Sequence, residues 1–364
     1  MGGSDLDYYS TPSPSALSKA RKKLKSSAFT EASDFIVNDF YKTQKTLTWH
    51  GYRLVAIDGS TLRLPDAKEI REKFGVHRNQ STDCPLARMS QAYDPLNNIA
   101  LSVAIDSCHV SEKGLLPKHY LYLKENDLVL MDRGYPSYRL FYELFDRKCQ
   151  FCMRIKTYGW RNVQSFLDSN KDEDIQEFVP SSKSIKKFQE LGFSAKGVKL
   201  RMIRVNLPGG ESEVLITSLL DRNNYPSQLF KNLYFLRWGV EEAYKKYKCR
   251  LNVEMFMGKT VQAIHQEVQA MVLCHNLTSI IVWETQRKIP KSRKVNRKYP
   301  IQINWNEAYF EVKQLIDKLL CSNSLLNALS FLKNILTKRV LPVIANRKNK
   351  RKKIYKKVTS STYR

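Results

Sequence analysis

The sequence contains no long hydrophobic run. No apolar stretch reaches the roughly 18 residues that a membrane-spanning helix needs. The first residues also lack the basic segment and apolar core of a secretory signal peptide. These absences argue against a helical membrane protein, and we expect a cytoplasmic protein with no membrane partner.

Paired cysteines at metal-ligand spacing are also missing. The chain has 7 scattered cysteines, and only Cys149 and Cys152 form a C-x2-C pair. A structural zinc site of this type needs a second pair of ligands, and this pair lies in an apolar run where buried thiols are ordinary. The sequence therefore predicts no zinc site and fits a reducing compartment.

Acidic residues are scarce relative to basic ones. The chain has 35 Asp and Glu against 61 Lys and Arg, a formal net charge of +26, and no acidic residue follows Asp317. Such an excess predicts a polyanionic partner, with nucleic acid ahead of an acidic membrane surface. The basic tail has few apolar anchors, so any membrane binding would be purely electrostatic.

Strand-like and helical segments follow one another from residue 53 onward. Apolar runs typical of strands cover 53–57, 87–93, 99–105, 128–131 and 150–155, and helices are expected at 114–123 and 137–147. The order β-β-β-α-β-α-β predicts an α/β fold. Asp58 directly follows the first of these strands, and Asp132 directly follows the strand at 128–131.

Composition divides the chain into four parts. We expect a basic helical region at 1–50, a core made of 51–156 and 214–286, and a basic helix and tail at 287–364. The polar stretch at 157–213 contains Asp and Ser clusters and a Pro-Gly-Gly turn, and we interpret it as a β-rich insertion. The core is expected to resume at 214 with an apolar strand.

The most informative segment is an expected helix at 227–248. It carries Tyr234, Arg237, Glu241 and Lys248 at the spacing Y-x2-R-x3-E-x6-K. On a regular helix these four side chains fall within roughly 60° of one another. A tyrosine, two cations and a carboxylate on one face suit a phosphate held beside a metal-binding carboxylate.

A purely structural interpretation of this face is also open. Arg237 and Glu241 could form a surface ion pair, although Arg preceding Glu is the poorer orientation. Tyr234 would then be half-buried core and Lys248 a solvated charge. The nearby Trp238, Tyr244 and Tyr247 could stack on unpaired bases, with core packing favoured for at least one of them.

Asp58, Asp132 and Glu241 are the candidate metal ligands. Mg²⁺ prefers hard oxygen ligands and is typically held by a few carboxylates plus substrate phosphate. Two such ions can activate a water and stabilise the leaving oxygen in phosphodiester cleavage. Asp58-Gly59 alone is more often a turn than a ligand, so the hypothesis depends on the three carboxylates together.

Several segments resemble bacterial insertion-sequence transposases of the DDE class, in the group named for its Tyr-Arg-Glu-Lys signature. The resemblance covers most of the chain and includes segments 15–21, 58–61, 132–135, 234–248 and 254–276. It implies an RNase H-like mixed sheet flanked by helices, with the β-rich insertion between the second Asp and the Glu. It further implies that Asp58, Asp132 and Glu241 bind Mg²⁺ or Mn²⁺, and that Tyr234, Arg237 and Lys248 hold DNA.

The resemblance implies a metal-dependent enzyme that cleaves DNA at transposon ends and transfers the strand into target DNA, with two protomers on paired ends. Two alternatives stay open: a nuclease of the same fold that does not join DNA, and a decayed copy that only binds DNA. Only about 50 residues precede the first strand, whereas family members often carry a longer end-recognition region. We therefore expect a truncated N-terminal region.

Overall fold

The computed structural model describes residues 13–79, 82–193, 196–206, 212–289, 299–321 and 325–344. Within the predicted basic helix and tail at 287–364, the stretches 290–298, 322–324 and 345–364 lie outside these residues.

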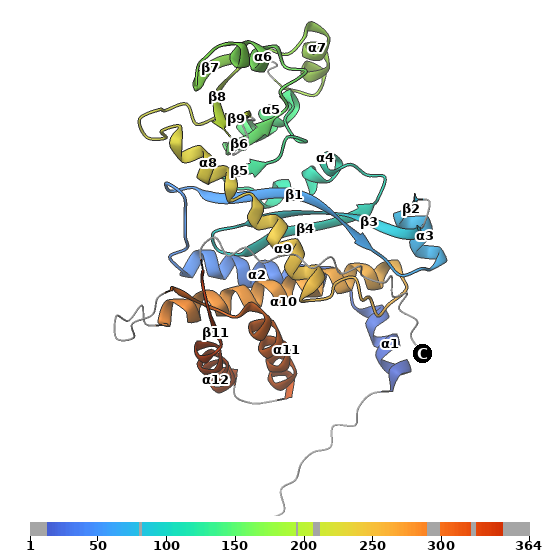
Figure 1. Ribbon diagram of the computed structural model, residues 1–364. Helices are drawn as coiled ribbons and strands as arrows, with labels where there is room; N and C mark the ends of the chain where they lie inside the picture. Colours follow the sequence, from blue (N-terminus) through green and yellow to red (C-terminus); the bar gives the residue numbers. More distant parts are fainter. Residues whose placement is uncertain are drawn as a thin grey trace, which may run out of the picture.

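One mixed β-sheet runs through the molecule (Figure 1), in the order β2-β3-β1-β5-β6-β9-β8-β7. The remaining strand, β4, also pairs with β3. Its strands are β1 (Arg53–Arg63), β2 (Val76–Asn79), β3 (Thr82–Asp94), β4 (Ile99–Ser107), β5 (Asp127–Met131), β6 (Gln150–Ile155), β7 (Glu173–Phe178), β8 (Val198–Asn206) and β9 (Ser212–Thr217). β1, β5 and β6 are parallel, whereas β3 and β4 on one side and β9, β8 and β7 on the other add antiparallel strands. This arrangement confirms the predicted RNase H-like mixed sheet.

Helices flank this sheet and continue beyond it. They are α1 (Pro14–Lys23), α2 (Ser27–Thr43), α3 (Lys68–Phe74), α4 (Glu112–Leu115), the 3-10 helix η1 (Leu116–Tyr122), α5 (Tyr138–Asp146), α6 (Arg161–Asp168), α7 (Ser182–Glu190), α8 (Gln228–Phe235), α9 (Trp238–Cys249), α10 (Val261–Lys288), α11 (Trp305–Cys321) and α12 (Leu325–Lys338). Two short strands, β10 (Ile301–Ile303) and β11 (Val340–Pro342), pair with each other.

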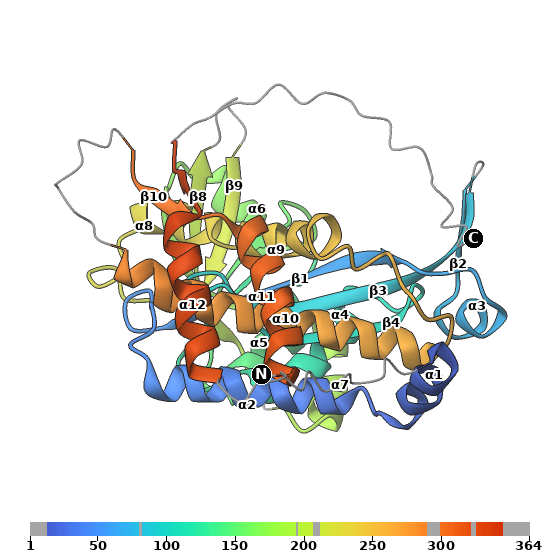
Figure 2. The same ribbon diagram turned by 90° about the horizontal axis from the view of Figure 1, so that it is seen from below.

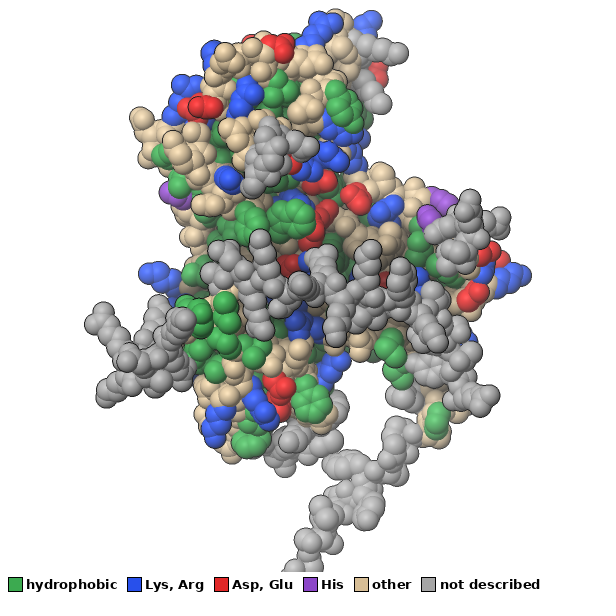
Figure 3. All heavy atoms as spheres, in the orientation of Figure 1, with side chains coloured by type: hydrophobic (Ala, Val, Ile, Leu, Met, Phe, Trp, Pro, Cys, Tyr) green, Lys and Arg blue, Asp and Glu red, His purple; other side chains and the backbone are tan. Residues whose placement is uncertain are grey.

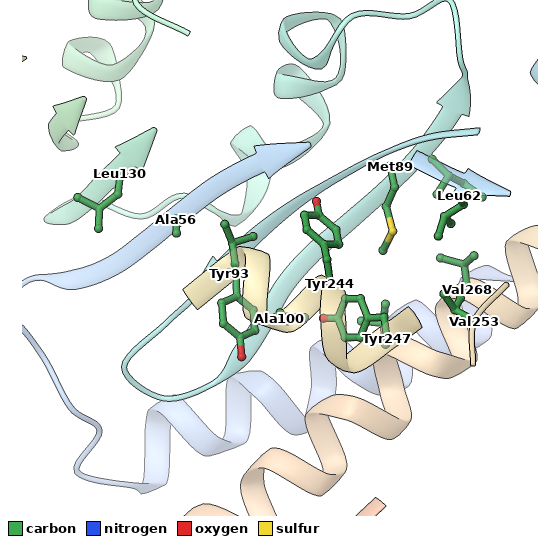
Figure 4. Packing of buried hydrophobic residues seen from close by; sticks show 14 of the residues in the cluster. Ala56, Leu62, Met89, Tyr93, Ala100, Leu130, Tyr244, Tyr247, Val253 and Val268 are labelled. Atoms are coloured by element: carbon green, nitrogen blue, oxygen red, sulfur yellow. The ribbon is translucent and has the colours of Figure 1, made fainter. Parts of the chain in front are cut away.

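The central strands are buried on both faces, as their continuous apolar sequence predicts for parallel strands. On β1, Leu54 and Ala56 belong to a hydrophobic cluster that includes α9 and the first half of α10, while Val55 and Ile57 belong to a second cluster with α2 and α5. Figure 4 shows Tyr244 and Tyr247 of α9 packed in the first cluster. The sheet therefore holds β1 and β5 rigidly between two apolar layers.

The C-terminal helices form a separate small core. Figures 1 and 2 show α11 and α12 against the second half of α10, on the side away from the sheet. Ile281 and Val282 of α10 pack there with Val312 and Leu336. Among the described helices, none is both long enough and apolar enough to span a membrane.

Two sequence predictions about helices were wrong in detail. The helix expected at 114–123 is mostly 3-10 in form: the α-helix α4 ends at Leu115, since Pro117 has no N–H to continue it, and the chain goes on as the 3-10 helix η1. The helix expected at 227–248 is two helices, α8 and α9, with Leu236 and Arg237 between them. The segment 157–213 contributes β7, β8 and the first residues of β9 to the sheet, together with α6 and α7.

Candidate active site

Asp58 and Asp132 lie side by side because they follow the paired parts of two parallel strands. β1 and β5 pair in parallel from Arg53 opposite Asp127 to Ala56 opposite Leu130. β5 ends at Met131, so Asp132 begins the loop, whereas β1 continues through Asp58 to Arg63 because β3 still pairs with it. The prediction that the first strand ends before Asp58 was therefore wrong, but its proximity to Asp132 was predicted correctly.

Local backbone N–H groups orient both aspartates. The Gly59 N–H donates to Oδ1 of Asp58 at 2.8 Å, and the Gly134 N–H donates to Oδ1 of Asp132 at 2.7 Å. A Cβ atom at position 134 would lie 3.0 Å from that same Oδ1. Glycine at 134 thus lets the loop fold back closely onto the carboxylate it orients.

The break between α8 and α9 places Arg237 and Glu241 in the site. The Arg237 N–H donates to the Tyr234 carbonyl at 3.0 Å, and the Val240 N–H to the Arg237 carbonyl at 3.2 Å, so the chain tightens here to three-residue hydrogen-bonded turns. A Cβ atom at Gly239 would lie 2.6 Å from the Cβ of Pro95. Glycine therefore allows α9 to start against the β3–β4 turn, with Glu241 in its first turn, where the helix dipole favours a carboxylate.

Arg237 joins the two chain segments that carry Asp58 and Glu241. Its Nη1 lies 3.0 Å from Oδ2 of Asp58, and its Nη2 lies 2.9 Å from Oε1 of Glu241. The side chain is only 7% exposed and lies 5.6 Å from the ring centre of Tyr234 and 5.1 Å from that of Trp238. The interpretation of Arg237 and Glu241 as a simple surface ion pair was therefore wrong.

The remaining signature residues lie in different surroundings. Tyr234 is buried on the wall of the cleft described below, and it also belongs to the hydrophobic cluster under α9. Lys248 lies near the end of α9, where its Nζ donates to Oγ of Ser60 on β1 at 3.0 Å, and it does not line the cleft. Of the aromatic candidates for stacking, Trp238 is exposed, whereas Tyr244 and Tyr247 are buried core.

A cleft of about 550 Å³ brings the three predicted carboxylates together. Figure 3 shows acidic side chains gathered in the hollow between the part of the molecule that carries β7 to β9 and the rest of the sheet. The cleft is lined by Asp58, Asp132, Arg154, Val205, Glu213, Leu215, Lys231, Asn232, Tyr234, Phe235, Arg237, Trp238 and Glu241.

Sequence reasoning missed several polar residues of this site. Arg154 on β6 and Glu213 on β9 form an ion pair on the cleft wall, and Lys231 of α8 lies nearby. Glu112 of α4 packs so closely over Gly59 that a Cβ there would lie 2.4 Å from its side chain. Arg154 and Glu213 come together only through the pairing of β6 with β9, which leaves no local pattern in the sequence.

The carboxylates influence one another electrostatically. Burial raises the pKa of Asp58 to about 6, against the lowering effects of the Gly59 N–H and Arg237. Asp132 and Glu112 add to the increase because each is a further negative charge close by. A cation in the cleft would relieve this repulsion.

The donor set suits a hard divalent cation, but the described residues include no group of three His, Cys, Asp or Glu side chains already arranged around a metal position. Arg237 instead takes one oxygen from Asp58 and one from Glu241. Three carboxylates on one cleft are the ligands that Mg²⁺ prefers. Their assignment as metal ligands stays a prediction.

Three buried donors on the cleft wall have no hydrogen-bond partner within the described part of the chain. They are the Tyr234 hydroxyl, Nε of Arg237 and Nε of Arg154. A buried donor without a partner costs free energy, so native structures rarely keep one without a reason. Their grouping in one cleft is suited to an anionic, oxygen-rich ligand such as a phosphate.

Known proteins resemble this chain over its central part. Residues 49–277 match the family described as the transposase DDE domain. The transposase InsG for insertion sequence element IS4 of Escherichia coli (strain K12) is 23% identical over 309 residues, which cover 83% of this chain and 67% of that protein. The putative transposase InsZ of the same strain is 29% identical over 121 residues, which cover 32% of this chain and 40% of that protein.

A solved structure also shows a likeness. In the cryo-EM structure of the piggyBac transposase synaptic complex with hairpin DNA, the similar region covers 78% of this chain and 57% of that chain, at 10% identity and a TM-score of 0.44. The family match spans more than half of the sequence and includes Asp58, Asp132 and Glu241. The chain therefore belongs to the transposase DDE domain family and is a transposase of the insertion-sequence type.

Proposed function

We propose that this transposase cleaves DNA at the ends of its insertion sequence and joins the freed ends to target DNA, using one metal-dependent site. The observation that carries the proposal is the cleft in which Asp58, Asp132 and Glu241 meet three buried donors that have no partner in the described part of the chain. A phosphodiester-cleaving site needs carboxylates that bind metal cations and hydrogen-bond donors that bind the phosphate.

The carboxylates would hold the metal. Asp58, Asp132 and Glu241 supply hard oxygen ligands for Mg²⁺ or Mn²⁺, and we expect two ions. When bound, such ions lower the pKa of a water and neutralise charge on the leaving oxygen. Because the fold fixes both aspartates at neighbouring strands, the chain needs no large rearrangement of its backbone to present them.

The donors would hold the DNA backbone. Arg237 and Tyr234 are within the cleft, and a phosphate oxygen there would satisfy Nε of Arg237 and the Tyr234 hydroxyl. Lys248, near the end of α9, contacts Ser60 of β1 outside the cleft and suits a neighbouring phosphate of the same DNA strand. Arg154 joins this set because its Nε, on the same wall, has no hydrogen-bond partner among the residues that the structure describes.

Two reactions follow from one site. In the first, the water oxygen bonds to phosphorus as the P–O3′ bond breaks, which leaves a 3′-hydroxyl on the element end and a 5′-phosphate on the flanking DNA. In the second, that 3′-hydroxyl attacks a phosphorus of target DNA and displaces a target 3′-oxygen. We expect two protomers, one for each element end.

Cleavage of DNA carrying the element's own end tests the proposal. Asp58→Asn, Asp132→Asn and Glu241→Gln should each lower Mg²⁺-dependent cleavage by about a hundredfold or more, the scale expected for loss of one group that stabilises charge in the transition state. Glu242→Gln is the matched control, because Glu242 is the exposed neighbour of Glu241 and pairs with Lys245.

The outcomes separate the alternatives. Cleavage without joining to target DNA would indicate a nuclease, and DNA binding without any metal-dependent cleavage would indicate a decayed copy. Full cleavage by any of the three carboxylate variants would rule out that residue as a ligand.

A further inference from the structure

Arg237 occupies the position between two of the three carboxylates. It bonds Oδ2 of Asp58 and Oε1 of Glu241 at 3.0 and 2.9 Å, and the exposed fractions of the three side chains are 7%, 14% and 30%. Charge-assisted bonds in such a protected place are strong. The same two carboxylates are proposed ligands of the metal.

A metal ion and the Arg237 guanidinium would compete for Asp58 and Glu241. A divalent cation shared by Asp58 and Glu241 would lie close to the guanidinium, and like charges repel strongly in a protected site. Arg237 and the metal therefore cannot both use these oxygens at full strength. Metal binding is therefore favoured when Arg237 releases at least one of the two carboxylates.

The cleft offers Arg237 another partner. Its Nε is buried without a hydrogen-bond partner in the described residues, as are the Tyr234 hydroxyl and Nε of Arg154 on the same wall. A DNA phosphate bound there would accept from these donors and attract the guanidinium. The rings of Tyr234 and Trp238 lie beside the guanidinium and limit how far it moves.

We propose that Arg237 is a built-in counter-cation that pairs Asp58 with Glu241 until a DNA phosphate draws it away. Metal binding and DNA binding are then coupled through one side chain, and the protein without DNA holds metal weakly. This inference rests on the proposed function, since it takes Asp58 and Glu241 as the metal ligands. Its biological consequence is a site that becomes competent only when DNA is in place.

Direct metal binding tests the coupling. Mn²⁺ binding to the full chain without DNA is measured by the electron paramagnetic resonance signal of free Mn²⁺, and the part lost in Asp58→Asn is taken as the site. Arg237→Gln should bind Mn²⁺ about tenfold more tightly than wild type, because a nearby positive charge is removed. Lys245→Gln removes one charge from an exposed position of α9, where Lys245 pairs with Glu242, and its affinity should stay within about twofold of wild type.

A second arm uses DNA. A short duplex of arbitrary sequence should raise the Mn²⁺ affinity of wild type, and this gain should be several times smaller in Arg237→Gln. Arg237→Lys keeps the charge but cannot bridge both carboxylates, so its affinity without DNA should lie between those of wild type and Arg237→Gln. This variant decides the question if melting curves show that Arg237→Gln does not fold.

The outcomes distinguish a failure of the proposed coupling from a failure of the proposed metal ligands. Arg237 variants that bind Mn²⁺ no more tightly than wild type, while Asp58→Asn abolishes binding, would overturn the coupling and leave the proposed function intact. Mn²⁺ binding that is unaffected by Asp58→Asn would overturn the metal assignment itself.

Discussion

The two sides of α9 both carry cations and aromatic rings, yet their hydrogen bonding differs. On the cleft side, Arg237 lies between carboxylates, and its Nε and the Tyr234 hydroxyl have no partner among the described residues. On the opposite side, Lys246 donates to Oδ1 of Asn98 at 3.0 Å and lies 3.9 Å from the ring centre of Trp305.

The opposite side extends into a closed network. Fully buried His275 bonds the Tyr309 hydroxyl through Nδ1 at 2.7 Å and the Asn98 carbonyl through Nε2 at 3.1 Å. These contacts connect α10, α11 and the β3–β4 turn behind α9. The difference teaches that unusual residues alone do not mark a site. A hydrogen-bonded network stabilises the fold, whereas donors that lack a partner among the described residues, next to several carboxylates, indicate a ligand-binding site.

The largest effect on stability should come from the closed network. His275→Ala removes a fully buried ring and leaves the Tyr309 hydroxyl and the Asn98 carbonyl without this partner. We expect the free energy of unfolding to fall by about 3 kcal/mol, from the cavity and the lost hydrogen bonds together. Urea denaturation measures this decrease in the free energy of unfolding. A decrease below about 1 kcal/mol would mean that the network around His275 does not stabilise the fold.

Lys246 should make the stability of the opposite side of α9 depend on pH. Burial, with a smaller contribution from Arg250, lowers its pKa from 10.5 to about 8 in the folded chain. Below pH 8, Lys246 is protonated in both the folded and the unfolded chain, and its buried charge lowers the stability of the folded chain. Between pH 8 and 10.5 only the unfolded chain keeps the proton, so the cost disappears as pH rises.

Wild type should therefore gain about 3 kcal/mol of stability relative to Lys246→Met over that pH range. Urea melts across the range measure the difference. Lys245→Met is the control, because Lys245 is exposed and paired with Glu242. A stability difference between wild type and Lys246→Met that does not change with pH would mean that Lys246 is not buried as a cation.

The smallest effect on stability gives the sharpest test, because the same change, tyrosine to phenylalanine, is made on each of the two sides of α9. Tyr309→Phe removes a hydroxyl that bonds His275 and should cost about 1 kcal/mol. Tyr234→Phe removes a buried hydroxyl without a described partner and should cost almost nothing, or stabilise slightly. Thermal melts compare the two, and equal losses would remove the distinction between the sides.

Tyr234→Phe should nevertheless weaken DNA binding. Loss of one hydrogen bond to a charged phosphate predicts an affinity about tenfold lower, whereas Tyr309→Phe should bind DNA like wild type. Fluorescence anisotropy with a labelled duplex measures both variants.

Asp58 and Asp132 were recognisable from the sequence because each follows an apolar run that forms a buried strand segment, although β1 continues past Asp58 to Arg63. The partnership of Arg237 was not, because a regular helix was assumed where α8 and α9 are separate, and burial of the guanidinium depends on packing across the sheet. The different fates of Trp238 and Tyr247, nine residues apart on α9, likewise depend on which face meets the core. Lys248 has the predicted spacing but contacts Ser60 outside the cleft.

The shared sheet has a mechanical consequence for the cleft. β1, β5, β6 and β9 are joined edge to edge by backbone pairing, so the wall that carries Arg154 and Glu213 is part of the same framework as Asp58. These walls cannot swing apart on a hinge without breaking strand pairing. Adjustment to a substrate must then come from rotating side chains and from distortion of the substrate itself, because this framework stays rigid.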